Sequence, residues 1–467
     1  MLVVVVVGAG LVAATGSTSP WFPKQWDPRV APIAAEVARL RGLDFEHPVS
    51  VRFLSPAEFE KEVSSDPRSL SHDARAEIDR QAADFRALGL INGNVDLAKA
   101  LNTTSQSGTL AFYSYIHKNI VVRGTTLDAE HRVTLAHELT HVLQDQHFDL
   151  TKLYNRADKS TTGDTGAFLA LVEGDAVRVE DLYKQSLSTA EQHEYDREYA
   201  AEGERVKKEA VGVPDVIQFL FGAPYEFGPA TPTVLADGGG HAAIDAALTG
   251  PVPSTVVFIQ PGNVAAPPSV AAPAVPEGAT AVGDPESFGA FETYLTLGAT
   301  IDPSRALDAA DVVANGRART YRTNGRDCYA VSLMPRRAAS RPFLEAAVRE
   351  WVAGKPDAAM VPGGSNVTFR ACDPGKKAVG ITKARLQALD DLLGIRTGLT
   401  TGLADGGNLE ADQARCVARV FVHDAAARAL LLEIGDGTPT PAQASRLRDT
   451  ASNAALQCVG NSDAQLH

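Results

Sequence analysis

Residues 134–147 read TLAHELTHVLQDQH, and this stretch contains the pattern H-E-x-x-H. On a helix, His137 and His141 differ by about 40° around the axis and lie ~6 Å apart along it. Both imidazoles can therefore hold one zinc ion. Glu138 lies beside them without being a ligand, so it can accept a proton from a water molecule that the ion activates. Apolar neighbours predict that this helix is buried: Val133, Leu135, Val142 and Leu143.

The segments around this motif predict further helices and strands. The motif helix is expected over Leu127–His147, with Thr125 or Thr126 as its cap. A turn at His117 and Lys118 separates two runs that resemble paired strands. The expected strands are Pro48–Leu54, Leu110–Tyr115 and Asn119–Val122, and the other expected helices are Ala74–Leu90, Phe168–Leu187 and Ala190–Val211.

Two residues compete for the third ligand position. His147 has the metzincin spacing, but those enzymes need a glycine where this chain has Gln144. On an unbroken helix His147 would lie ~9 Å beyond His141 and about 240° around the axis, too far away to share the ion. We therefore interpret His147 as a capping or packing residue. Glu173 would complete a His₂Glu site with one open position, which is the catalytic pattern.

The surroundings of Glu173 suggest how such a site would be supported. Gly174 would let the two helices approach closely, and Asp175 or Asp145 could orient a ligand histidine. The alternative for Glu173 is a solvated helix glutamate, an interpretation that its combination with H-E-x-x-H disfavours.

Composition limits the class of protein. The chain has 467 residues, 44% hydrophobic residues and a net charge of −13. The length predicts two to four domains, and the acidic balance argues against a nucleic-acid partner. The domains expected are an N-terminal segment 1–17, a catalytic domain 18–262, a Pro/Ala-rich connector 263–287, a small α+β unit 288–380 and a C-terminal helical domain 381–467.

The first twenty residues, MLVVVVVGAGLVAATGSTSP, are interpreted as a signal peptide cleaved after Ala14 or as an N-terminal membrane anchor. A basic n-region is missing. A dinucleotide-binding motif is the first alternative, but residues 16–20 would end its helix too early. A buried β-strand is the second.

All four cysteines lie in the last third of the chain: Cys328, Cys372, Cys416 and Cys458. Three pairings are possible. The sequential pairing, Cys328 with Cys372 and Cys416 with Cys458, would close loops of about 40 residues and support export. The alternative is four inert buried thiols in a cytosolic protein.

At this level the chain resembles a known family. The segments HELTHVLQDQHFDL and LVEGDA are similar to bacterial gluzincin-type zinc metallopeptidases, the peptidase MA-like group. Weaker similarities are Pro224-Tyr-Glu-Phe-Gly228, Gly238–Gly240 and Pro253–Thr255. The resemblance covers residues 48–262 and extends faintly to about 360. It is specific at the two metal motifs.

The resemblance implies an α+β fold with a zincin-like core of active-site helices and a small sheet. It implies His137, His141 and Glu173 as ligands of one Zn²⁺ per chain and Glu138 as the base. Tyr225 would donate to the oxyanion, the alternative being an aromatic residue in a proline-rich turn. Asn119–Val122 would be the substrate-binding edge strand. The chain departs from the pattern at His241 and at residues 260–262, which affects specificity.

We therefore expect an exported peptidase, secreted or at the cell envelope, that cleaves a peptide or protein substrate. Two alternatives are open. One is a non-catalytic envelope binding protein that keeps a structural zinc site. The other is hydrolysis of a non-peptide amide.

Overall fold

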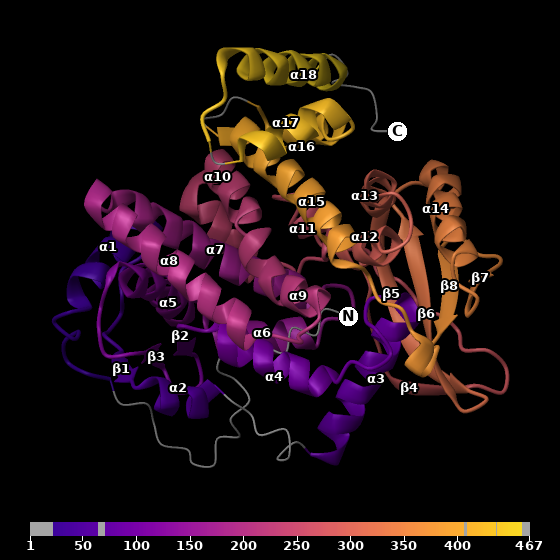
Figure 1. Ribbon diagram of the computed structural model, residues 1–467, viewed down its shortest axis with the longest axis horizontal. Coiled ribbons are helices and arrows are strands. Elements are labelled where there is room, and N and C mark those ends of the chain that lie inside the picture. Colours follow the sequence, from indigo (N-terminus) through magenta and orange to yellow (C-terminus); the bar gives the residue numbers. More distant parts are fainter. Residues whose placement is uncertain (1–21, 64–70, 406–408, 436, 460–467) are drawn as a thin grey trace.

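The computed structural model describes residues 22–63, 71–405, 409–435 and 437–459 (Figure 1). The chain is an α+β protein in which helices predominate and the strands form two separate sheets. The expected N-terminal signal or anchor lies outside the described residues. Among the described segments, no helix combines the length and the apolarity needed to cross a membrane.

The first sheet contains three short strands in the order β1-β3-β2. They are β1 (Ser50–Leu54), β2 (Ala111–Ser114) and β3 (Asn119–Arg123). β1 runs parallel to β3, and β2 runs antiparallel to it. The predicted hairpin is confirmed: the turn contains Lys118 with a left-handed φ of 54°. The predicted edge strand 119–122 is wrong, because β3 lies in the centre of this sheet and β2 lies at its edge.

The helices around this sheet are α1 (Ala31–Arg41), α2 (Pro56–Val63), α5 (Ala129–Phe148), α7 (Thr165–Ser186) and α8 (Thr189–Glu209). α5 contacts β2, α1, α7 and α8. Its N-cap is Asp128, whose carboxylate accepts from the amide of His131, and not Thr125 or Thr126. α8 buries only Tyr195 among its own residues, in agreement with the solvated helix expected there.

The second sheet is antiparallel and has the order β4-β5-β6-β8-β7. The strands are β4 (Thr280–Ser287), β5 (Val313–Thr323), β6 (Arg326–Pro335), β7 (Ala358–Val361) and β8 (Val367–Cys372). β4 occupies the last eight residues of the predicted connector. Gly283 and Pro285 conceal this strand in the sequence, and the structure has a register shift there between Val282 and Glu286.

The remaining helices connect the two sheets and extend to the C-terminus. They are α3 (His72–Leu88), α4 (Leu97–Gly108), α6 (Leu150–Asp158), α9 (Asp215–Glu226), α10 (Ala230–Thr249), α11 (Val256–Ile259), α12 (Ala290–Gly298), α13 (Pro303–Asp311), α14 (Arg341–Ala353), α15 (Lys383–Ala404), α16 (Ala411–Phe421), α17 (Ala425–Ile434) and α18 (Pro441–Val459). Short 3₁₀ turns cover Ala338–Ser340 and Gly375–Lys377. Residues 409–435 and 437–459 of the predicted helical domain are mostly helical, as expected.

One hydrophobic core crosses the predicted domain boundaries. It joins Phe85 on α3, Phe227, Phe291 on α12, Trp351 on α14 and Leu389 on α15. A second core packs α1 and α5 against the three-stranded sheet. Residues from three of the predicted domains therefore bury their apolar side chains together.

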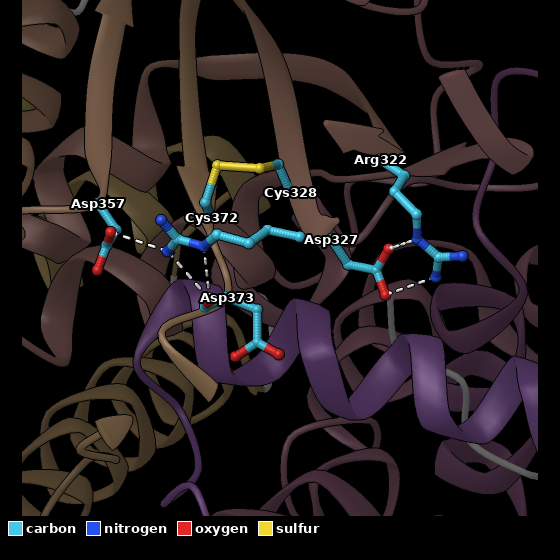
Figure 2. Close-up of a disulfide and its surroundings, with 7 residues drawn as sticks. Arg322, Asp327, Cys328, Asp357, Cys372 and Asp373 are labelled. Carbon is cyan, nitrogen blue, oxygen red and sulfur yellow. Dashed lines mark hydrogen bonds and ion pairs between the residues drawn. A yellow bond between two sulfur atoms is a disulfide. The ribbon is translucent and has the colours of Figure 1, made fainter. Parts of the chain in front are cut away.

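Both disulfides follow the sequential pairing, Cys328–Cys372 and Cys416–Cys458. Figure 2 shows the first of them joining β6 to β8, where the two cysteines are directly opposite each other. Close to this disulfide, Arg326 binds the carboxylate of Asp357 and the carbonyl of Asp373. The two disulfides indicate that the chain folds in an oxidising compartment.

Replacing Cys328 and Cys372 together by alanine should lower the free energy of unfolding by about 2–4 kcal/mol, because the disulfide closes a 44-residue separation. Equilibrium urea unfolding without reductant measures this difference. An unchanged midpoint and slope would show that this bond adds nothing to stability.

Candidate metal centre

α5 and α7 lie against each other and supply every residue of the candidate metal group (Figure 1). Each helix begins after an aspartate whose side chain accepts a hydrogen bond from a backbone amide of the first turn: Asp128 for α5 and Asp164 for α7. α5 contributes His137 and His141, and α7 contributes Glu173. The three side chains predicted as ligands therefore come together, on two helices of defined start.

The three donor atoms form a tight triangle. His137 Nε2 lies 3.1 Å from His141 Nε2 and 3.1 Å from Glu173 Oε2, and His141 Nε2 lies 3.2 Å from Glu173 Oε2. Bonds of ~2.0–2.1 Å to a tetrahedral ion place neighbouring donors about 3.3–3.4 Å apart. The donor set therefore fits a small ion and leaves one coordination position open.

Burial and charge define the protonation of this group. The three residues are each no more than 9% exposed. Burial by itself opposes protonation of His137, but Glu173 and Glu180 raise its pKa well above the usual value. Burial would raise the pKa of Glu173, yet the charge of His141 and hydrogen bonds from both histidines lower it to about 2. The imidazoles and the carboxylate therefore favour each other's charged forms.

Glu138 lies in the same buried region without joining the donor triangle. Its Oε2 accepts a 2.6 Å hydrogen bond from the backbone amide of Tyr113 on β2. Burial raises the pKa of Glu138, although the neighbouring histidines oppose the shift. This carboxyl group is therefore held between the motif helix and the edge strand of the sheet.

The groups that support the ligand histidines differ from those predicted. His137 Nδ1 lies 3.0 Å from Glu180 Oε2, and His141 Nδ1 lies 2.9 Å from Gln144 Oε1. Neither Glu180 nor Gln144 was predicted as a partner of a histidine, although the position of each along its helix would have allowed the prediction. Glu180 is seven residues after Glu173, on the same face of α7, and Gln144 is three residues after His141 on α5.

Asp145 binds the hairpin and not a ligand histidine. Its carboxylate accepts from Tyr113 Oη and Lys118 Nζ, both at 2.6 Å, and from the amide of Leu150. Lys118 is in the β2–β3 turn, so Asp145 fastens the hairpin to α5. Asp175 contacts no ligand histidine either: its Oδ2 accepts from Gln144 Nε2 at 3.0 Å.

Tyr225 lies close to the site, on α9 and not in a turn. Its ring centroid is 6.0 Å from that of His137, and 39% of the residue is exposed. Desolvation, followed by the charge of Glu173, raises its pKa well above the ordinary value, so the phenol keeps its proton.

Gly174 on α7 allows the chain around Gly228, between α9 and α10, to lie close to α7. A Cβ there would meet the carbonyl of Gly228 at 2.4 Å, so the glycine admits the junction between α9 and α10. The expectation that Gly174 serves the contact between α5 and α7 is therefore wrong.

Three further residues considered in the sequence lie away from the donor triangle: His147, His241 and Gln260. His147 continues α5 and is exposed, and its Nε2 lies 2.8 Å from the carbonyl of Asp44, so it does not join the donor group, as expected from the unbroken helix. His241 packs against Gly42 at the end of α1. Gln260 Nε2 donates to Asp311 Oδ1 at 3.1 Å.

Comparison of the chain with family models, with curated proteins and with solved structures finds no match. The site is therefore characterised by its own geometry: a buried His137–His141–Glu173 group that could hold a metal ion.

His141→Ala and Glu173→Ala should each lose stoichiometric metal, because three protein donors leave no redundancy. His147→Ala should retain it, since that side chain points to Asp44. Elemental analysis after dialysis against zinc measures both. Loss of metal in His147→Ala with retention in Glu173→Ala would contradict the assignment.

Proposed function

We propose that this chain is an exported, zinc-dependent peptidase. The observation that carries the proposal is the convergence of His137, His141 and Glu173 on one point, with Glu138 buried beside them. Two imidazoles and one carboxylate with an open position form the donor set of catalytic zinc sites. Such a set suits zinc better than calcium or magnesium, which prefer oxygen ligands alone.

Each residue of the site would have a separate role in the proposed hydrolysis. A bound zinc ion would polarise the scissile carbonyl and make water a nucleophile at neutral pH. Glu138 would accept the proton of that water and transfer it to the leaving amine. Tyr225, protonated and on the rim, would donate to the developing oxyanion.

The edge strand β2 supports a peptide as substrate. Leu110 bonds to β3 through its carbonyl, so the alternation of an antiparallel pair turns the backbone groups of Ala111 and Tyr113 to the other side. The Tyr113 amide on that side donates to Glu138 Oε2, so an added peptide would bond to the Tyr113 carbonyl and to the backbone of Ala111. No other strand pairs with β2 in the part of the chain that the structure describes. An extended peptide could add there, next to Glu138.

The disulfides support export. Two cross-links that use all four cysteines are typical of secreted or envelope proteins, and rare in the cytosol. The zincin-like core and the envelope location belong to this same proposal.

Glu138→Gln tests the catalytic step. The amide keeps the size of the side chain but cannot accept the proton, so hydrolysis should be lost while one zinc per chain remains. The measurement pairs zinc content with digestion of a broad peptide library by wild type and variant.

Equal behaviour of wild type and Glu138→Gln in that digest, with zinc present in both, would favour a binding protein with a structural zinc site. Cleavage of amide substrates other than peptides, again dependent on Glu138, would change the substrate class and keep the mechanism.

Tyr225→Phe should lower kcat by about 10²–10³ with little change in KM, the effect of removing one oxyanion donor. Steady-state kinetics on a cleaved library peptide measures the two constants. An unchanged kcat would leave Tyr225 as an aromatic wall of the site.

A further inference from the structure

The two ligand histidines have different partners behind them. His137 Nδ1 faces the carboxylate of Glu180, whereas His141 Nδ1 faces a neutral amide oxygen, Gln144 Oε1, at 2.9 Å. A histidine that binds a metal through Nε2 carries its proton on Nδ1. An amide oxygen accepts and cannot donate, so Gln144 Oε1 selects this tautomer of His141.

The orientation of the Gln144 amide is itself determined. Its Nε2 donates to the carbonyl of Val172 and to Asp175 Oδ2, both at 3.0 Å. A reversed amide would place its oxygen against two acceptors and its nitrogen toward the His141 proton. Val172 and Asp175 flank Glu173, so Gln144 joins the ring of His141 to the segment of α7 that carries the third ligand.

Asp175 is held in turn by α1. Arg41 Nε donates to Asp175 Oδ2 at 2.8 Å, and Arg41 Nη2 donates to Asp245 Oδ1 at 2.6 Å. The side chains of Arg41 and Asp175 are fully buried. A continuous polar chain therefore runs from α10 through α1 and α7 to His141 on α5.

We propose that Gln144 is the residue that positions His141 for the metal, and that Asp175, held by Arg41, keeps the Gln144 amide in the required orientation. This inference rests on the metal site of the proposed function. Gln144 lies behind the ligand and not at the reacting atoms, so it is a positioning residue.

Gln144→Leu and Gln144→Met test the proposal in the full-length protein. Both variants should bind zinc about 10–100-fold more weakly, the usual effect of removing a partner of a ligand histidine. Chelator competition measures the affinity. The absorption spectrum of the Co²⁺-loaded protein should also change, because a rotated His141 alters the ligand field.

Gln146→Leu is the matched control. Gln146 is on the same helix, donates to the carbonyl of His47 and accepts from the amide of Glu46, both at 2.8 Å. The Gln146→Leu variant should lose these two hydrogen bonds but keep the zinc affinity and the Co²⁺ absorption spectrum of the wild type.

Asp175→Asn tests whether Asp175 acts by orienting the Gln144 amide or by its negative charge. One oxygen of Asp175 serves both Gln144 and Arg41, so an amide oxygen can replace it. Zinc affinity should stay close to that of wild type. A loss as large as in Gln144→Leu would overturn the orientation role of Asp175.

Unchanged affinity and spectrum in both Gln144 variants would overturn the proposal, as would an equal loss in Gln146→Leu. A wild type that binds no zinc overturns the metal site and this inference together. Zinc binding by wild type with unchanged Gln144 variants overturns this inference alone.

Discussion

The buried Glu173 carboxylate, between two imidazoles, is the constraint on which the rest of the site depends. Transferring an ionised carboxylate out of water is costly unless other groups compensate its charge. Here His137 and His141 lie within 3.2 Å of it, and they account for its lowered pKa. A metal ion would meet the same requirement, so the cluster is suited to exchanging protons for a cation.

That constraint explains the polar groups around the cluster. Each ligand histidine has its second nitrogen against an acceptor, Glu180 or Gln144. Asp145 fastens the β2–β3 hairpin to α5, which brings the amide of Tyr113 to Glu138. The edge strand β2 thus forms a third side of the site, next to the packed helices α5 and α7.

The second half of the chain is physically continuous with the first. Its five-stranded sheet shares a core with α3, with Val216, Ile217 and Ala223 of α9, and with Phe227 directly after it. α9 also carries Tyr225. The end of α9 approaches α7 closely because Gly174 and Gly228 lack side chains. The position of Tyr225 therefore depends on packing that involves both halves of the protein.

The sequence by itself determined the local features. Spacing of four residues puts His137 and His141 on one helix face, and an uninterrupted helix removes His147 from the site. The hairpin at Lys118 also follows from local pattern, and the sequential cysteine pairing, one of three possible, was the one that the sequence favoured. Tertiary structure decided the rest, because contacts between distant segments leave no local pattern. Only the fold placed β2, and not β3, at the sheet edge, and put Glu180 and Gln144 in place of Asp145 and Asp175 behind the two histidines. Only the fold also brought Arg41 to Asp175, 134 residues further along the chain, behind the candidate metal group.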